Sequence, residues 1–297
     1  EMVLGYTLAP HHLAMLHFLM SRRQGLVLAF RGSGKSTICT ILRSIYEIIR
    51  DPNIRILLAS KSHGNAKGFL REIKNQFERN ERLIEIFGNF VGGRKWGEEE
   101  VEVMQKTSTW KEPTISTVGV GSTVVSKHYD MINGDDLVDG KNARTIPMRE
   151  QMLTWYYMTL HPTLIPFSEK NPNSGKFPHE GTRFNYADMY GYLIANEFAD
   201  DHLIIPALSP DGVSAWEEEY PAEHFIGERK KKGSIIFNAQ YQCNAAAMKG
   251  ALFRWDWIQW YAAAERPKTG RVYMGVDLAI GEKATNDCFA IVVISVT

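Results

Sequence analysis

A short glycine-rich segment separates an apolar strand from a helix near the start of the chain. Residues 26–30 (LVLAF) form a continuous apolar run typical of a buried strand, and the next seven residues read RGSGKST. Apolar residues then recur at helical spacing from Ile38 to Ile49, until Asp51 and Pro52 end the pattern. A strand, a glycine turn and a helix in this order predict an α/β fold with a mostly parallel sheet flanked by helices.

The composition of this turn predicts a phosphate-binding loop. Small residues allow successive backbone N–H groups to surround a phosphate chain, and the following helix adds the positive end of its dipole. Lys35 is expected to reach the β- and γ-phosphates of ATP, and the Ser36 hydroxyl to coordinate Mg²⁺. The strict pattern has glycine where this chain has Ala29, but the flanking strand and helix support the interpretation. The predicted nucleotide-binding residues of the loop are Gly32, Ser33, Gly34, Lys35, Ser36 and Thr37.

A second apolar strand ends in a pair of carboxylates. Residues 129–133 are followed by Gly134, Asp135 and Asp136. At a strand end that accompanies a phosphate-binding loop, Asp135 is expected to hold the Mg²⁺ shell and Asp136 to orient the attacking water. Two alternatives stay open: Asp139 orients the water instead, or the acidic pair only caps a turn.

The rest of the chain alternates between segments with the patterns of strands and of helices. Further strands are expected at 54–59, 177–182 and 203–208, and helices around 69–77, before 160 and at 221–242. Residues 98–128 have the pattern of irregular strands and turns. Residues 271–277 and 288–296 are expected to be two strands of a new sheet.

Composition restricts the class of protein. Hydrophobic residues make up 44% of the chain and charged residues 23%, which is ordinary for a soluble globular protein. The longest apolar run, near residues 289–294, is too short to cross a bilayer, and no leader segment opens the chain. Neither a membrane protein nor a secreted protein is expected. The three cysteines are too scattered for a disulfide framework or a zinc site.

The formal net charge is zero, but the charge is unevenly distributed. Residues 1–95 carry 15 basic and 7 acidic side chains, residues 96–225 carry 9 and 21, and residues 226–297 carry 10 and 6. Such a protein can contact DNA through local basic runs such as residues 229–232, although a solvated helix end is the more common role of a run like this one.

Four segments of the chain carry a resemblance to a known family. The first is the glycine-rich loop, in which Arg31 lies four residues before Lys35, and the second is the acidic pair, which Asn142 and Arg144 follow. The third is the sequence EGTRFN at 180–185, followed by Asp188 and Tyr190, and the fourth is FNAQYQCN at 237–244. In this order they resemble the large terminase subunit of tailed bacteriophages, the motor and nuclease that packages viral DNA. The third segment resembles the coupling motif that links hydrolysis to movement, and the fourth resembles the linker between motor and nuclease.

The resemblance assigns roles beyond loop geometry. It implies that Arg31 lies near the γ-phosphate and stabilises charge in the transition state. It implies that Thr182 senses the γ-phosphate and that His12 stands where these motors contact adenine. The predicted catalytic residues are Arg31, Lys35 and Asp136.

Members of this family often place a second arginine, which acts on a neighbouring subunit, just before the acidic strand. This chain has Lys127 and His128 there, and lysine lacks the planar guanidinium fork. Lys127, Arg144 and Arg183 are therefore all candidates for the trans-acting group.

The last strands resemble the opening of a terminase nuclease domain, which has an RNase H-like fold. Asp277 matches its first metal-binding carboxylate, for Mg²⁺ or Mn²⁺, but two-metal hydrolysis needs further carboxylates, so we expect a truncated nuclease domain. The expected domains are a P-loop ATPase motor at 1–245 with a lid at 210–245, a linker at 246–268 and the start of the nuclease at 269–297.

The resemblance implies an ATP-hydrolysing motor that moves double-stranded DNA into a viral procapsid. Its implied partners are DNA, the portal protein, the small terminase subunit and further copies of the chain in a ring, in the cytoplasm of the infected host. A P-loop helicase is the closest alternative, although few residues follow Asn244 for a second motor domain. A third hypothesis is a nucleotide-dependent switch with negligible turnover. Arg31 and Asp136 argue against it, because a switch has little need of catalytic residues.

Overall fold

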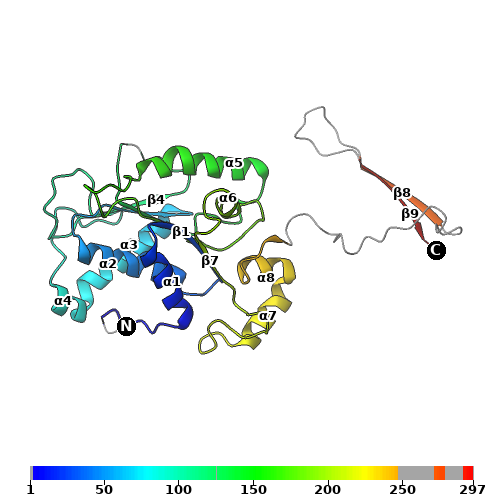
Figure 1. Cartoon of the computed structure of the whole chain (residues 1–297), viewed down its shortest axis with the longest axis horizontal. Coiled ribbons are helices and arrows are strands. Elements are labelled where there is room, and N and C mark those ends of the chain that lie inside the picture. The colour runs from blue at the N-terminus through cyan, green and yellow to red at the C-terminus, as the bar shows by residue number, and fades with distance from the viewer. Residues whose placement is uncertain (1–2, 125, 247–270, 278–289, 297) are drawn as a thin grey trace. The chain divides into compact units, whose positions relative to one another are not determined.

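The computed structural model describes residues 3–124, 126–246, 271–277 and 290–296. The chain divides into two compact units, residues 1–250 and 251–297, and each is described by itself. The first unit contains a large sheet with its helices (Figure 1), and the described part of the second consists of two strands.

A seven-stranded sheet forms the centre of the first unit. Its strands are β1 (Gln24–Ala29), β2 (Ile56–Ser60), β3 (Glu100–Val101), β4 (Ile115–Gly119), β5 (Met131–Asp135), β6 (Phe177–Gly181) and β7 (His202–Ile205). They lie in the order β3-β4-β2-β5-β6-β1-β7, and every neighbouring pair is parallel except β3 with β4. The predicted α/β class with a mostly parallel sheet is confirmed.

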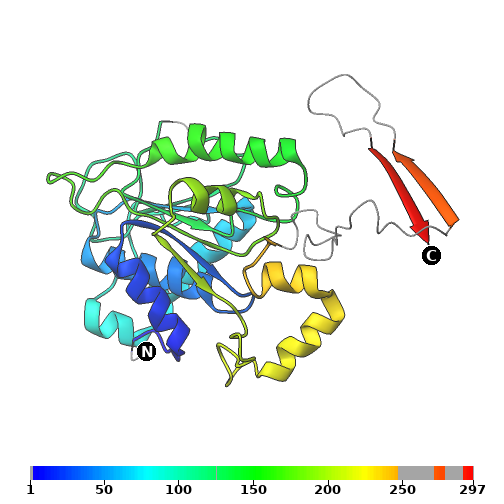
Figure 2. The same ribbon diagram turned by 45° about the vertical axis from the view of Figure 1, so that its right-hand side comes forward.

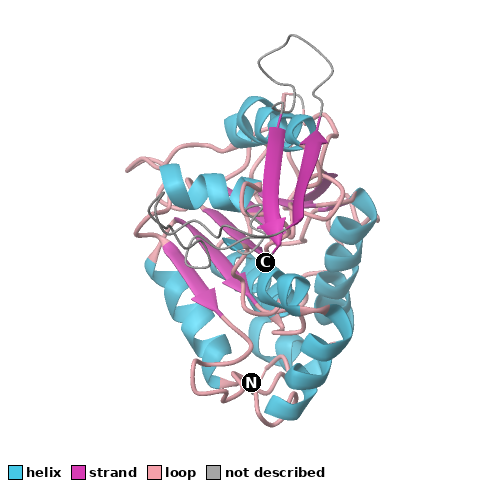
Figure 3. Ribbon diagram, turned by 90° about the vertical axis from the view of Figure 1, so that its right-hand side faces the viewer, coloured by secondary structure: helices cyan, strands magenta, loops and turns pink. Residues whose placement is uncertain are grey.

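Eleven helical segments surround the sheet within the described residues of the first unit. They are α1 (Pro10–Ser21), η1 (Ser36–Leu42), α2 (Arg43–Arg50), α3 (His63–Arg79), α4 (Glu81–Phe87), α5 (Ile146–Trp155), η2 (Tyr156–Leu160), η3 (His161–Thr163), α6 (Met189–Asn196), α7 (Ala222–Lys232) and α8 (Ser234–Gln240). Figure 3 shows helices on either side of the strands.

Alternating side chains of β1 pack against different helices. Leu26 and Leu28 of β1 belong to the core that contains α5, η2 and α6, whereas Val27 and Ala29 belong to the core that contains α1, η1, α7 and α8. A third core joins β2, β4 and β5 to α2, α3 and α4. Both faces of the sheet are therefore covered, which explains why the central strands are continuous apolar runs.

The register of the sheet brings three strand ends together. β1 lies between β6 and β7, with Leu28 opposite Gly181 of β6. On the other side of β6, Glu180 lies opposite Asp135 of β5. Because these strands are parallel, their carboxyl ends meet at one edge of the sheet, where the phosphate-binding loop and the acidic pair both begin.

Two predicted helical stretches are interrupted in the structure. The first turns after the phosphate-binding loop, η1, are π-helical, and an α-helix begins only at Arg43. Within 221–242, Gly233 separates α7 from α8 with a φ of +79°, a left-handed conformation that glycine adopts without strain and that ends a helix. The basic run 229–232 forms the last turn of α7, where positive charge complements the helix dipole.

Several elements were not predicted as such from the sequence. β4 lies beside β2 within the sheet, but Ser116 and Thr117 break its apolar run, so residues 98–128 had the pattern of irregular structure. Helices α4 and α6, of seven and eight residues, have little room for a periodic pattern, and the 12-residue α1 was also not predicted. His12, interpreted only as a nucleotide contact, lies in the first turn of α1.

The second unit contains two antiparallel strands, β8 (Arg271–Asp277) and β9 (Ala290–Val296), which Figure 2 shows side by side. They lie where two strands were expected, with Arg271 opposite Val296 and Asp277 opposite Ala290. The predicted linker, residues 246–268, lies outside the described residues except for residue 246. Among the helices that the structure describes, none is long and apolar enough to span a membrane.

Candidate nucleotide site

The phosphate-binding loop joins β1 to η1 at the carboxyl edge of the sheet. Gly32 and Gly34 have φ values of +94° and +73°, a region that residues with side chains rarely adopt, and these glycines allow the backbone to turn tightly around the loop. A Cβ on Gly34 would also lie only 2.9 Å from Nε2 of His12. Lys35 is buried, and Thr37 is partly buried on η1. This curvature is the one needed for backbone N–H groups to converge on a phosphate.

The acidic pair after β5 faces this loop. The Ser36 hydroxyl donates to Oδ1 of Asp135 at 2.5 Å, and Nζ of Lys35 lies 3.8 Å from Oδ1 of Asp136. Asp136 has a φ of +43°, which is uncommon for a residue other than glycine. Its Oδ1 is buried and takes part in no hydrogen bond with the described residues. A polar atom in this state is available to a ligand or a water.

A third carboxyl group, that of Glu180 on β6, lies beside Asp135. Glu180 is buried and accepts a hydrogen bond from the Thr40 hydroxyl at 2.6 Å. Burial raises the pKa of Glu180 well above its usual range, and the charge of Asp135 raises it further. Burial also raises the pKa of Asp135, although hydrogen bonds from Glu180 and Ser36 oppose this effect. The stronger shift at Glu180 favours its protonated form over that of Asp135.

Two histidines of α1 contact the loop from behind. The Ala9 N–H donates to Nδ1 of His12 at 3.0 Å, so Nε2 of the neutral ring carries the proton and donates to the Ser33 carbonyl at 2.8 Å. Nε2 of His11 lies 3.0 Å from the same carbonyl. Burial lowers the pKa of both histidines and favours their neutral forms. His12 is only 3% exposed and supports the loop in this structure, and its contact with adenine stays a prediction.

Arg31 contacts α8 in this structure. Its guanidinium donates to Oε1 of Gln240 at 3.2 Å, and its backbone N–H donates to the Gln240 carbonyl at 3.1 Å. The side chain is exposed at the edge of the loop. The segment 237–244, singled out in the sequence for its resemblance to a linker, therefore contacts the loop that holds the predicted phosphate ligands.

In the predicted coupling segment, the side chains of Thr182 and Arg183 are buried. Thr182 directly follows β6 and is 5% exposed. Nε of Arg183 lies 3.0 Å from Oδ1 of Asp188, and Nη2 donates to the backbone carbonyls of Asn185 and Tyr186. The Arg183 guanidinium thus stabilises its own loop.

The other two candidates for a trans-acting group have different surroundings. The Lys127 ammonium forms an ion pair with Glu100. Arg144 is exposed, and its side chain has no hydrogen bond or ion pair within the part of the chain that the structure describes. Of the three candidates, Arg144 is therefore the one whose guanidinium is available to another molecule.

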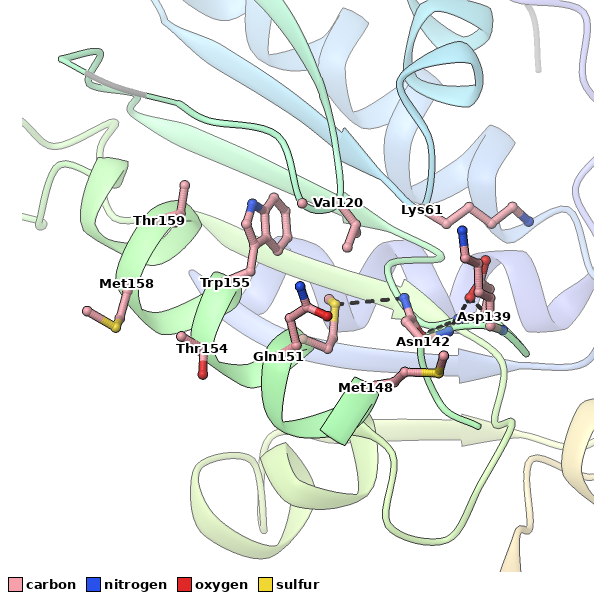
Figure 4. A pocket seen from close by; sticks show the side chains of 13 residues that line it. Lys61, Val120, Asp139, Asn142, Met148, Gln151, Thr154, Trp155, Met158 and Thr159 are labelled. Carbon is pink, nitrogen blue, oxygen red and sulfur yellow. Dashed lines mark hydrogen bonds between the residues drawn. The ribbon is translucent and has the colours of Figure 1, made fainter. Parts of the chain in front are cut away.

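Asp139, the rival for the water-orienting role, caps a turn. Its Oδ1 accepts hydrogen bonds from the N–H groups of Lys141 and Asn142. It also lines a separate cavity of about 600 Å³. Figure 4 shows Asp139, Asn142 and Lys61 at one end of this cavity, with Trp155 at some distance from them. These contacts favour Asp136, which faces Lys35, over Asp139.

The predicted nuclease carboxylate, Asp277, is the last residue of β8, and its side chain lies outside what the structure describes. Within the described residues, no group of three or more histidine, cysteine, aspartate or glutamate side chains could hold a metal ion. The pair formed by Ser36 and Asp135 is still sufficient for Mg²⁺, which proteins bind through one or two side chains together with phosphate oxygens and waters.

Sequence reasoning did not assign roles to several residues that form the site. Glu180, Tyr190, His11 and Gln240 appeared only within segments that carry a resemblance, and Thr40 was not considered. A signal existed for Thr40, because it lies four residues after Ser36 and so on the same face of a helix. Nothing local to residue 240 indicates a contact with residue 31.

Comparisons with known proteins bear on the fold. No protein-family model and no curated protein matches the sequence. Among solved structures, an arginine-to-alanine mutant of the Thermus phage P74-26 large terminase ATPase domain matches with a TM-score of 0.54 and 14% identity. The same domain without that mutation matches with a TM-score of 0.52 and 15% identity, and both matches cover 82% of this chain and 96% of the other. At this identity the likeness shows the fold, which is that of a terminase ATPase domain.

Proposed function

We propose that this chain is the ATP-hydrolysing motor of a large terminase subunit. The observation that carries the proposal is the meeting of four side chains at one sheet edge. Ser36 with Asp135, and Lys35 with Asp136, pair the phosphate-binding loop with the acidic strand end. This is the arrangement that Mg²⁺-dependent phosphoryl transfer requires, and it occurs on the fold of a terminase ATPase domain.

The residues present fit a magnesium–ATP complex. Mg²⁺ would be held by the Ser36 hydroxyl and Asp135, and when bound it neutralises charge that develops on the phosphate oxygens. Lys35 would contact the β- and γ-phosphates. Glu180 lies opposite Asp135 in the sheet, and burial raises its pKa, which favours the neutral carboxyl group beside the proposed metal ligand.

Asp136 is the proposed water-orienting group. Its Oδ1 is buried and free of hydrogen bonds from the described residues, and a carboxylate can accept a hydrogen bond from the attacking water there. Arg31 would exchange the Gln240 side chain for a γ-phosphate oxygen and stabilise the transition state. Thr182 and His12 are proposed contacts of the γ-phosphate and the base.

The remaining features of the proposal rest on the resemblance of the sequence motifs to those of large terminase subunits. The motor would translocate double-stranded DNA as a ring of copies, with a portal protein and a small terminase subunit as partners, in the cytoplasm of an infected bacterium. The strands β8 and β9 would begin an RNase H-like nuclease domain in which Asp277 binds Mg²⁺ or Mn²⁺.

Phosphate release with ATP and Mg²⁺, measured with and without double-stranded DNA, tests the proposal. We expect hydrolysis that DNA stimulates and that Lys35→Ala abolishes while circular dichroism shows an intact fold. A helicase would instead unwind a short duplex. A switch would bind ATP with negligible turnover in both conditions. Turnover that persists in Lys35→Ala would mean that the loop is not the active site.

A further inference from the structure

A buried tyrosine hydroxyl joins the ends of β5 and β6 behind the acidic pair. Tyr190, on α6, is fully buried. Its hydroxyl donates to the Glu180 carbonyl at 2.9 Å and accepts a hydrogen bond from the Leu137 N–H at 3.0 Å. The N–H of Asp136 donates to the same Glu180 carbonyl at 2.9 Å. Two successive N–H groups, of Asp136 and Leu137, are thus tied to one carbonyl oxygen of β6, the second through Tyr190.

The turn at Asp136 needs such support. Its φ of +43° is a conformation that costs free energy for a residue with a side chain and persists only where the surroundings hold it. In this conformation the carboxylate points back to the loop, with Oδ1 3.8 Å from Nζ of Lys35. Without the tyrosine hydroxyl, the Leu137 N–H would lose its partner, and the turn could relax and carry the carboxylate away.

We propose that Tyr190 is a positioning residue for hydrolysis, which holds the Asp136 turn in the conformation that aims its carboxylate at the phosphate-binding loop. The proposal rests on the ATPase function proposed above. Tyr190 acts through the backbone of the acidic turn and is not one of the predicted ligands of ATP or Mg²⁺. Its loss should therefore lower turnover and leave nucleotide binding largely intact.

The same residue connects Asp136 to the predicted coupling segment. Asp188 is the N-cap of α6, where it accepts a hydrogen bond from the Gly191 N–H, and it also binds the Arg183 guanidinium. Tyr190 follows two residues later on the helix that Asp188 caps. A displacement of the 183–188 loop would therefore move the hydroxyl that holds the Asp136 turn.

Tyr190→Phe tests the proposal because it removes only the hydroxyl. In a steady-state assay of phosphate release, we expect kcat to fall by about 10- to 100-fold and KM for ATP to change by less than about twofold. Tyr156→Phe is the matched control. Tyr156 is equally buried, and its hydroxyl hydrogen-bonds to Nε2 of His179 on the same strand at 2.8 Å. Tyr156→Phe loses a buried hydroxyl hydrogen bond that does not involve the backbone of the Asp136 turn. The kcat of this variant should therefore stay close to that of the unaltered chain.

Hydrogen–deuterium exchange provides a readout that does not depend on turnover. Without nucleotide, the peptide that covers residues 134–139 should exchange faster in Tyr190→Phe than in the unaltered chain or in Tyr156→Phe. Unchanged exchange of this peptide, or an equal kcat in the two phenylalanine variants, would overturn the proposal. If the unaltered chain shows no Lys35-dependent phosphate release, the ATPase function fails, and the exchange measurement still decides whether Tyr190 holds the turn.

Discussion

Asp136 and Asp139 are close in sequence, but their carboxylates have different partners. Asp136 faces Lys35, whereas Asp139 accepts hydrogen bonds from two backbone N–H groups of its own turn. We expect Asp136→Asn to retain nucleotide binding and to lose turnover, because the amide is a much weaker proton acceptor than the carboxylate. Nucleotide binding and phosphate release, measured on the same preparation, check this.

Asp139→Asn is the matched control for this change. It keeps one oxygen that can accept the backbone hydrogen bonds, so turnover should stay close to that of the unaltered chain. If Asp139→Asn is instead the change that stops hydrolysis and spares binding, the water-orienting role belongs to Asp139.

Arg31 is held by Gln240 in this structure, so its catalytic role requires an exchange of partners. Arg31→Ala should lower kcat far more than nucleotide affinity, because a group that stabilises charge in the transition state contributes little to the ground state. The expected loss is about 10³-fold, at the lower end of the effect of an arginine in this role. Kinetics and equilibrium binding of a fluorescent nucleotide measure the two quantities.

Gln240→Ala separates this role from a structural one. It removes only the side-chain contact, since the hydrogen bond from the Arg31 N–H is to the backbone carbonyl of Gln240. If that contact restrains Arg31, the variant should turn over at least as fast as the unaltered chain. An equal loss of affinity and rate in Arg31→Ala would instead indicate that the arginine binds phosphate in the ground state.

At the scale of the elements, β6 carries a buried histidine beside the acidic site. His179 is fully buried, and burial lowers its pKa from 6.5 to about 3. The folded state therefore keeps the ring neutral, while the unfolded chain binds a proton below about pH 6.5. The stabilisation is complete above that pH and is lost as the pH falls from 6.5 towards 3.

This linkage predicts an acid-sensitive fold. Between pH 6.5 and about pH 4.5, His179 alone should reduce the free energy of unfolding by on the order of 2 kcal/mol. Denaturant titrations of the unaltered chain and of His179→Gln, at several pH values, isolate this contribution as the difference between the two slopes. Glutamine can still offer a hydrogen-bond partner to the Tyr156 hydroxyl. Parallel slopes in the two proteins would show that another group is responsible.

Much of the fold could be predicted because its strongest signals are local. Five of the seven strands of the sheet overlap a predicted strand, and four of them agree with it to within two residues at both ends, because central parallel strands are uninterrupted apolar runs. β4 was not predicted as a strand of this kind because Ser116 and Thr117 break its apolar run, and only its neighbour β2 identifies it. The helix predicted at 221–242 is divided at Gly233 because this one residue has a positive φ. The helical pattern of the flanking residues does not reveal that angle.

The candidate site was predictable where its residues belong to one motif. The contacts of Ser36 with Asp135 and of Lys35 with Asp136 follow from a known arrangement of two strand ends. The contacts of Glu180 with Asp135 and of Tyr190 with Leu137 depend on sheet register and on where α6 packs, and these are products of the whole fold. The inward turn of Arg183 depends on Asp188, five residues away, whose role as an N-cap is visible only in three dimensions.

At the scale of the whole molecule, three basic side chains are candidates for a group that acts on a neighbouring copy. Lys127 is paired with Glu100 and Arg183 is bound to Asp188, so neither is free without breaking an ion pair. Arg144 is exposed and has no side-chain partner among the residues described. In the proposed ring, its guanidinium can therefore reach a neighbouring copy without breaking an ion pair. We therefore expect Arg144 to act on the site of a neighbouring copy.

Mixing two inactive variants tests this expectation. Asp136→Asn lacks the water-orienting carboxylate but keeps Arg144, whereas Arg144→Ala keeps an intact site but lacks the arginine. In a mixed ring, some boundaries combine an intact site with an intact arginine, so the mixture should release phosphate faster than either protein alone. Arg144→Ala mixed with the double variant Asp136→Asn/Arg144→Ala should show no gain, because no copy supplies the arginine. Light scattering must show oligomers under the assay conditions. If oligomers are present and the first mixture gains nothing, Arg144 is not the trans-acting group, and the same test applied to Lys127→Ala becomes the next experiment.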